Sequence, residues 1–235
     1  MNDSTFKMGE RSDRRLLVFA KAPEPGRVKT RLARSMGREA ACDVYRSMIR
    51  ELTDRLGDGK DFDVEVMWTG SSALAGAELV DAFAPYRLAR QIGSDLGERM
   101  TVAFCERALL QRTTQIIAIG VDLPDIEMTE IESASLLLES CDWVIGPASD
   151  GGYYLIGCRA ESMDARVFEG IHWGEPSVCD ATTDRIRSLG ETVALLPERR
   201  DIDDFEDLRD YVERHPRGEI ASTVERIGIP ERSAS

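Results

Sequence analysis

The sequence predicts an α/β protein in which helices cover both faces of a mostly parallel sheet. Short apolar runs suited to buried strands alternate along the chain with longer segments of helical periodicity. The segments between successive runs are long enough for right-handed strand–helix–strand crossovers, which produce a three-layer, Rossmann-like α/β/α arrangement. Ligands of such folds bind beyond the carboxyl ends of the strands, so the residues that follow each predicted strand are the candidates for chemistry.

The first predicted strand is the apolar run 16–20, which is typical of a strand buried on both faces of a parallel sheet. Pro23, Pro25 and Gly26 exclude a helix from the loop that follows, and helical patterns resume from Val28 and again over 39–56. Further strands are predicted over 64–68, 88–91, 116–120, 143–146, 153–158 and 192–196. Further helices are predicted over 73–83, 96–110, 129–140, 177–189 and 205–215.

Length and composition indicate one domain. The chain has 235 residues, of which 42% are hydrophobic, enough for a sizeable core. We expect a single domain over 16–215, a flexible leader over 1–15 and a charged C-terminal appendage over 216–235 that is poor in core residues. No apolar run approaches the roughly 20 residues that span a bilayer, and the leader lacks the apolar stretch of a signal peptide. The protein is therefore expected to have no membrane span and to be cytoplasmic.

The charge and the cysteines exclude several classes of function. A formal net charge of −13 repels a nucleic-acid backbone, so a polynucleotide is not an expected partner. Five cysteines are an odd number without a Cys-x-x-Cys pair, which argues against a disulfide framework and a zinc site. We expect them to be reduced residues in or near the core; they are Cys42, Cys105, Cys141, Cys158 and Cys179.

Asp122 is the strongest single candidate for chemistry. It lies at the carboxyl end of the predicted strand 116–120, and Pro124 stiffens the turn behind it. Magnesium takes one or two carboxylates, several waters and the phosphate oxygens of a substrate. The sequence therefore favours Asp122 as a ligand of Mg²⁺ or Mn²⁺, with helix capping as the alternative. The nearby Asp125 is expected to cap the helix that follows.

A second group of carboxylates precedes the last predicted helix. Asp204, Glu206 and Asp207 suit the first turn of that helix, where acidic side chains meet the positive end of the helix dipole. Asp203 lies just before this turn and would reach the same metal as Asp122 if the fold brings the two segments together. Spacing alone leaves this open.

A basic loop follows the first strand and leads into a helix. Lys21, Arg27, Lys29 and Arg31 lie within it, and its cations and main-chain amides can converge on an anion at the helix start. Several cations at one place suit a polyphosphate. The alternative is an ordinary solvated loop, although basic residues at a helix start oppose the helix dipole.

Two glycine-bearing turns follow later strands. Segment 91–100 opens a helix and offers small residues where a flat base could approach the backbone, whereas segment 146–154 lies on the same ligand-binding edge. Each could also be a simple turn. His172 and Trp173 lie in a turn that either lines a substrate pocket or serves the structure, and His215 is expected to be exposed to solvent. There is no P-loop, no Gly-x-Gly-x-x-Gly sequence and no His-Glu-x-x-His sequence.

Four motifs together resemble one family. They are the loop Leu17–Leu32, the segment Asp95–Met100, the Gly-x-Asp-Leu-Pro sequence 120–124 and the segment 146–154 with its Gly-Gly-Tyr-Tyr end. The chain is similar over about 16–211 to the selenodomain-associated transferases, or uncharacterised glycosyltransferases. These belong to the nucleotide-diphospho-sugar transferase superfamily, which has the glycosyltransferase-A fold. More distantly, segment 201–208 is similar to the closing motif of cytidylyl- and guanylyltransferases, although Asp204-Phe205 stands where they have Thr-Pro.

The resemblance implies roles for individual residues. It implies that Asp122 and Asp203 bind the divalent metal. It also implies that the first loop holds phosphates with Lys21, Lys29 and Arg31. The candidates for a catalytic role are Lys29, Arg31 and Asp122. The remaining candidates are Lys21, Gly93, Leu96, Gly97 and Arg99 for the nucleotide, and Asp150, Gly151, Gly152, His172 and Trp173 for the second substrate.

Two reactions fit such a site. In nucleotidyl transfer a phosphorylated small molecule attacks a nucleoside triphosphate and pyrophosphate leaves; in glycosyl transfer an acceptor attacks the sugar of a nucleotide sugar. The number of cations in the basic loop slightly favours nucleotidyl transfer, and the family label favours glycosyl transfer. A non-catalytic nucleotide-binding protein is a third possibility, although both metal aspartates are present. The sequence carries no indication of the base, the acceptor or the oligomeric state.

Overall fold

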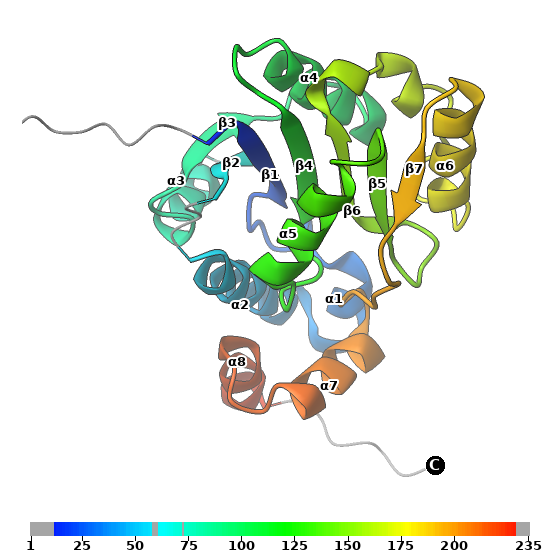
Figure 1. The fold of residues 1–235 in the computed structure, drawn as a ribbon. Coiled ribbons are helices and arrows are strands. Elements are labelled where there is room, and N and C mark those ends of the chain that lie inside the picture. Colours follow the sequence, from blue (N-terminus) through cyan, green and yellow to red (C-terminus); the bar gives the residue numbers. More distant parts are fainter. Residues whose placement is uncertain (1–11, 58–60, 72, 229–235) are drawn as a thin grey trace, which may run out of the picture.

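The computed structural model describes residues 12–57, 61–71 and 73–228 (Figure 1). These residues contain a seven-stranded sheet in the order β3-β2-β1-β4-β6-β5-β7. The strands are β1 (Arg14–Lys21), β2 (Asp63–Thr69), β3 (Arg87–Arg90), β4 (Gln115–Gly120), β5 (Trp143–Pro147), β6 (Tyr153–Arg159) and β7 (Val193–Leu195). Strand β6 runs antiparallel to both of its neighbours, β4 and β5, and the other described pairs are parallel. The predicted, mostly parallel sheet is confirmed.

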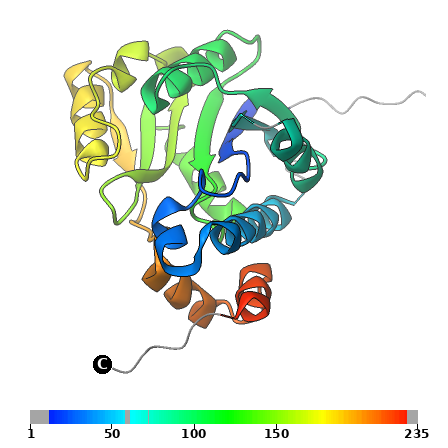
Figure 2. The same ribbon diagram turned by 180° about the vertical axis from the view of Figure 1, so that it is seen from behind.

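Helices cover both faces of this sheet (Figures 1 and 2). They are α1 (Thr30–Met36), α2 (Arg38–Leu56), α3 (Ala73–Ala82), α4 (Leu96–Ala108), α5 (Met128–Leu137), α6 (Val178–Ser188), α7 (Phe205–Arg214) and α8 (Glu219–Ile227), with the short 3₁₀ turns η1 (Ala160–Ser162) and η2 (Ala165–Phe168). Each predicted strand and helix has a counterpart among them.

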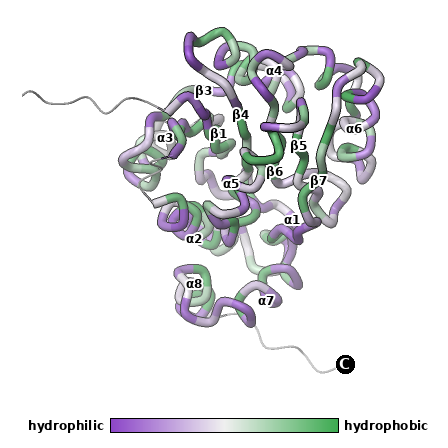
Figure 3. The backbone as a smooth tube through the Cα atoms, in the orientation of Figure 1, coloured by the Kyte–Doolittle hydropathy of each residue, from purple (hydrophilic) through white to green (hydrophobic). Residues whose placement is uncertain are grey.

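Alternate residues of the strands feed two separate cores. In β1, Leu16 and Val18 pack with α2 and α5, whereas Leu17 packs on the opposite face with α4 and α6. This is the period of two expected of a strand buried on both faces. Figure 3 shows the consequence, with apolar strands in the middle and mixed or polar segments in the surrounding helices. The three-layer α/β/α architecture is therefore confirmed.

The C-terminal segment differs from the expected appendage. Residues 219–227 form α8, whose Ile220 is fully buried in the core against α2. The buried Glu51 of α2 accepts hydrogen bonds from the Ile220 main-chain N–H at 2.7 Å and from the Tyr211 hydroxyl at 2.6 Å. The composition of this segment hid its role, because a helix with one narrow apolar face carries few core residues. The domain extends at least to Ile227.

The predicted leader falls mostly outside the described residues, which begin at Ser12; strand β1 already starts at Arg14. All five cysteines are free, and four of them are buried, as expected. In the described part of the chain, no helix combines the length and the apolar composition needed to cross a membrane.

Candidate functional site

Two adjoining cavities lie at the sheet edge where β1, β4 and β5 end. The first has a volume of about 460 Å³ and the second about 560 Å³. Their shared wall contains the end of β4, the start of β6 and parts of two loops; it consists of Thr30, Leu96, Gly120, Asp122, Tyr153, Tyr154 and Asp203. The cavities therefore occupy the edge of the sheet at which ligands of α/β folds bind.

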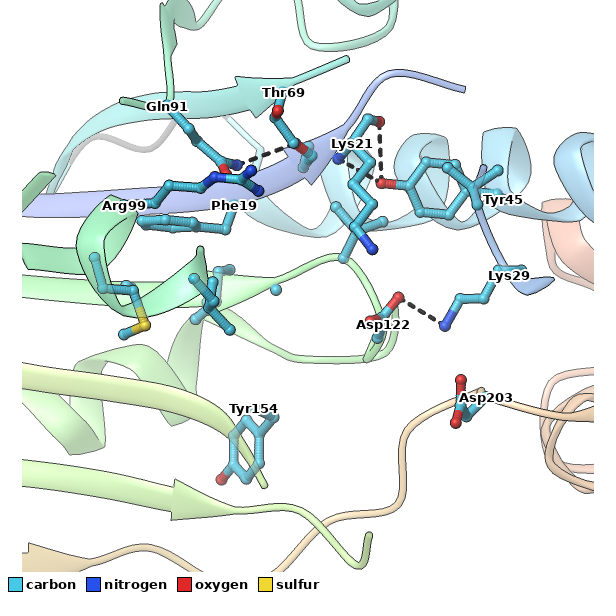
Figure 4. Close-up of a pocket in the computed structure, with 18 of the residues that line it drawn as sticks. Phe19, Lys21, Lys29, Tyr45, Thr69, Gln91, Arg99, Asp122, Tyr154 and Asp203 are labelled. Atoms are coloured by element: carbon cyan, nitrogen blue, oxygen red, sulfur yellow. Dashed lines mark hydrogen bonds and ion pairs between the residues drawn. The ribbon is translucent and has the colours of Figure 1, made fainter. Parts of the chain in front are cut away.

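The segment before α7 is tied to the end of β4 through Asp122. The Ile202 main-chain N–H donates to the Asp122 main-chain oxygen at 2.9 Å. The Lys29 ammonium donates to the main-chain oxygen of Ile202 and forms an ion pair with Asp122 Oδ1 at 2.6 Å (Figure 4). The Lys29 side chain is only 4% exposed, whereas that of Asp122 is 56% exposed. Through these two contacts, Lys29 joins the basic loop to the end of β4 and to the segment before α7.

The backbone of Lys29 explains how its side chain reaches this place. Lys29 has the left-handed dihedral angles φ 45° and ψ 51° and occupies the N-cap position of α1. This conformation costs a residue with a Cβ on the order of 1 kcal/mol. The contacts of the buried Lys29 ammonium with Asp122 and with the Ile202 main-chain oxygen offset this cost.

A second cation–carboxylate pair lies next to the first. Arg31 of α1 pairs with Asp203, and their side chains are 61% and 32% exposed. The neighbouring Asp204 caps α7 by accepting hydrogen bonds from the main-chain N–H groups of Glu206 and Asp207. The prediction that Asp204, Glu206 and Asp207 lie at the start of this helix is therefore confirmed. Asp203, which precedes them, lines both cavities.

Asp122 and Asp203 are the residues that could hold a divalent metal. Among the described residues, no group of three or more His, Cys, Asp and Glu side chains is arranged as a metal cage. Two partly exposed carboxylates at the shared wall instead match Mg²⁺, which takes one or two carboxylates and completes its shell with water and substrate oxygens.

Lys21 is held in place through its backbone. The Tyr45 hydroxyl accepts a hydrogen bond from the Lys21 main-chain N–H at 2.9 Å and donates to the Lys21 main-chain oxygen at 3.1 Å (Figure 4). Burial raises the pKa of Tyr45, and the nearby carboxylate of Asp122 raises it further. Sequence reasoning missed Tyr45, because one aromatic residue inside the amphipathic pattern of α2 is indistinguishable from an ordinary core residue.

The segment before α4 contributes in two different ways. Leu96 and Arg99 line the first cavity, together with Gln91, whose side-chain amide donates to the main-chain oxygens of Ala20 and Met67. Gly93 and Gly97 do not line either cavity. A Cβ at Gly97 would lie 2.5 Å from the Trp173 indole nitrogen, so this glycine is needed for packing against the second cavity's wall.

The Gly-Gly turn after β5 shapes the second cavity. Asp150, Gly152 and Trp173 line it, whereas Gly151 lies outside its lining. Gly151 has φ +88°, and a Cβ there would lie 1.9 Å from the Pro176 oxygen. His172 is exposed and lies outside the lining of both cavities, so its role in binding a substrate stays a prediction.

Asp201 also lines the second cavity, although sequence reasoning did not single it out. Burial raises the pKa of Asp201 to about 6, and the charge of Asp150 adds to this effect, while Lys29 opposes it. A run of acidic residues before a helix gave no signal to separate Asp201 from its neighbours.

Asp125 does not cap α5, and the prediction for it is corrected. Glu127 occupies the N-cap position, and Asp125 is a buried residue that pairs with Arg199 and Arg214 at 3.1 Å each. His215 approaches the same carboxylate at 3.1 Å and stacks near Tyr211, so it is partly buried rather than solvent-exposed. This cluster ties α7 to the loop after β4.

The fold and the paired cavities define a protein of the nucleotide-diphospho-sugar transferase fold class. The family described as "Uncharacterized protein conserved in bacteria (DUF2064)" matches residues 52–175, more than half of the chain. The chain belongs to this family. A candidate nucleotide-diphospho-sugar transferase from Desulfovibrio desulfuricans G20 is 32% identical, with a TM-score of 0.84 over 92% of this chain and 95% of that one.

More distant structures share the fold alone. A 4-diphosphocytidyl-2C-methyl-D-erythritol synthase from Anaerococcus prevotii DSM 20548 is 10% identical, with a TM-score of 0.57 over 88% of this chain and 100% of that one. A CMP:2-keto-3-deoxy-manno-octonic acid synthetase complexed with CTP is 12% identical, with a TM-score of 0.56 over 87% and 99%. A comparison with curated protein sequences finds no significant match.

Proposed function

We propose that this protein is a metal-assisted transferase that binds a nucleotide through its phosphates in the first cavity. The observation that carries the proposal is the contact of Lys29 with Asp122 and Ile202, which places a cation of the first cavity beside the shared wall that contains Asp122 and Asp203. A reacting phosphate at this wall would face a second substrate in the neighbouring cavity. The 32% identical candidate nucleotide-diphospho-sugar transferase supports the same class of reaction.

The first cavity carries groups suited to a nucleotide diphosphate. Its cations are Lys21, Arg27, Lys29 and Arg99. Charge-assisted hydrogen bonds from such groups hold phosphate oxygens in a fixed orientation. Asp122 and Asp203 would hold the Mg²⁺ or Mn²⁺. When bound, this ion would supply charge neutralisation for the departing phosphate group.

The contacts of the two central cations favour glycosyl transfer over nucleotidyl transfer. Lys29 and Arg31 each already have a carboxylate partner, so less positive charge is left for a departing pyrophosphate. In glycosyl transfer, the acceptor oxygen bonds to the anomeric carbon and the bond from this carbon to the diphosphate oxygen breaks. The nucleoside diphosphate leaves with the electron pair, and the acceptor proton passes to solvent. We therefore reverse the slight preference for nucleotidyl transfer that the number of basic residues suggested.

The test combines binding and product analysis. Calorimetry with Mg²⁺ and a panel of nucleoside diphosphates measures affinity, and incubation with nucleotide sugars and nucleoside triphosphates identifies the product. We expect free nucleoside diphosphate from at least one nucleotide sugar. Release of pyrophosphate instead would establish nucleotidyl transfer, and the absence of any nucleotide binding would overturn the proposal.

A pair of variants controls the assignment of the site. Asp122→Asn removes one carboxylate charge at the shared wall and should abolish the metal dependence of nucleotide binding. Asp184→Asn removes the same charge from α6, where the side chain is 80% exposed and lines neither cavity. It should bind nucleotide as the unmodified protein does.

A further inference from the structure

The two adjoining cavities differ in the charge of their walls. The first contains four cations, Lys21, Arg27, Lys29 and Arg99, against the two carboxylates Asp122 and Asp203. The second contains one cation, Arg31, against the five carboxylates Asp122, Asp150, Glu175, Asp201 and Asp203. The wall charge therefore changes sign across a boundary formed by Asp122 and Asp203.

The contacts within the second cavity increase this difference. Its one cation, Arg31, is already paired with Asp203. Across the described residues, no Lys, Arg or His side chain forms an ion pair with Asp150, Asp201 or Glu175. Within the described part of the chain, the Asp150 carboxylate accepts one hydrogen bond, from the Gly152 main-chain N–H at 2.8 Å. Oxygen acceptors therefore remain on this wall for donors of a bound molecule.

Aromatic rings form another part of the same wall. Tyr153 and Trp173 line the second cavity and meet edge to face, with ring centroids 6.4 Å apart. The position of Trp173 is set from behind by Gly97, where no side chain would fit. Aromatic faces beside carboxylate oxygens suit a molecule with both C–H surfaces and hydroxyl groups.

We propose that the second cavity binds a hydroxyl-rich group without phosphate, such as a sugar or polyol. The inference rests on the proposed function, in which the first cavity takes the nucleotide phosphates. Hydroxyl groups donate to carboxylates, whereas a phosphate placed among five carboxylates meets like charge on most sides. The inference departs here from the phosphorylated small molecule that the sequence suggested as acceptor.

The indole N–H resonance of Trp173 gives a readout located in this cavity. The chain has three tryptophans, and the resonance that disappears in Trp173→Phe identifies the relevant signal. The probes are matched pairs, glucose with glucose 6-phosphate and glycerol with glycerol 3-phosphate, added with excess Mg²⁺ and a nucleoside diphosphate. We expect at least one unphosphorylated probe to shift the resonance and its phosphate to bind at least about tenfold more weakly.

Variants then test whether charge causes the selectivity. Asp150→Asn and Asp201→Asn are each isosteric. Each should reduce the ratio of the affinity for glucose to the affinity for glucose 6-phosphate, whereas Asp184→Asn on α6 should leave this ratio unchanged. Equal or tighter binding of the phosphates, or no shift with any probe, would overturn the inference.

The two proposals fail separately. Calorimetric binding of nucleotide together with a preference for phosphorylated probes rejects the inference and keeps the proposed function. If instead the protein binds no nucleotide but prefers unphosphorylated probes in a charge-dependent way, the proposed function is rejected and the inference is kept.

Discussion

Ile202 and Asp122 are joined by a main-chain hydrogen bond of 2.9 Å, although 79 residues separate them in the chain. This bond brings the segment before α7 against the end of β4. Asp203 therefore lines the same cavity wall as Asp122. The Lys29 ammonium contacts both segments, through the Ile202 main-chain oxygen and the Asp122 carboxylate. The proposed metal pair therefore depends on a backbone contact as well as on two carboxylates.

Replacement of Asp122 by Ala should reduce stability as well as nucleotide binding. It leaves the buried Lys29 ammonium with the Ile202 oxygen but without a carboxylate, which costs about 1–3 kcal/mol of unfolding free energy. Urea unfolding measures this loss, and Asp184→Ala on exposed α6 should change stability by less than about 0.5 kcal/mol. Equal stability of the two variants would show that the Lys29 pair contributes nothing.

Lys29→Ala and Arg31→Ala should separate stability from binding. Lys29→Ala should weaken nucleotide binding by about 1–3 kcal/mol, because it removes a charge-assisted contact in the first cavity, whereas Arg31 lines only the second cavity and its loss should have a smaller effect. Arg31 is 61% exposed, so its loss should change stability by less than about 1 kcal/mol, whereas the buried Lys29 should matter more. Calorimetry and urea unfolding of both variants check this, with Arg187→Ala as the exposed control. A larger stability loss for Arg31→Ala would contradict it.

Gly151→Ala should distort the second cavity, and Gly190→Ala provides a matched control. Both glycines have left-handed φ angles, +88° and +86°, so an added Cβ costs each roughly 1–2 kcal/mol. Gly190 has no atom within 4 Å of the added Cβ, whereas at Gly151 it would lie 1.9 Å from the Pro176 oxygen. Urea unfolding should therefore show a larger loss for Gly151→Ala, and equal losses would mean that the loop of Pro176 moves away freely.

Stability should fall in acid through Asp142, a half-buried residue that directly precedes β5. Hydrogen bonds from Thr192, with help from Ser162 and Arg159, lower the pKa of Asp142 from 3.8 to about 2. A lowered pKa in the folded state means that the contribution is complete above pH 3.8 and is lost as pH falls toward about 2. It amounts to about 2 kcal/mol.

The measurement is urea unfolding of the unmodified protein and of Asp142→Asn across this pH range. The stability difference between them should shrink as pH falls, because the Asn side chain cannot titrate. A difference that stays constant from neutral pH to the acid end would show that Asp142 is not ionised in these contacts.

Local chemistry explains why part of the site could be predicted. Asp122 and the basic loop each follow an apolar strand, and the parallel strands β1 and β4 end at the same edge of the sheet. Their proximity therefore follows from the strand pattern. By contrast, the sequence alone could not show whether Asp125 or Glu127 caps the helix that follows, because both lie just before it. The tertiary structure decides this, since Asp125 forms ion pairs with Arg199 and Arg214 instead.

The sequence by itself determined the alternation of strands and helices, the buried faces of the strands and the position of Asp122 and Lys29 at the strand ends, because these depend on residue type and short-range periodicity. Only the tertiary structure decided that Asp203 lines the same cavities as Asp122, that Tyr45 holds Lys21 and that Asp150 and Asp201 share one cavity. These contacts join residues that are tens of positions apart. Their energies depend on how helices and loops close over the sheet, which no local pattern records.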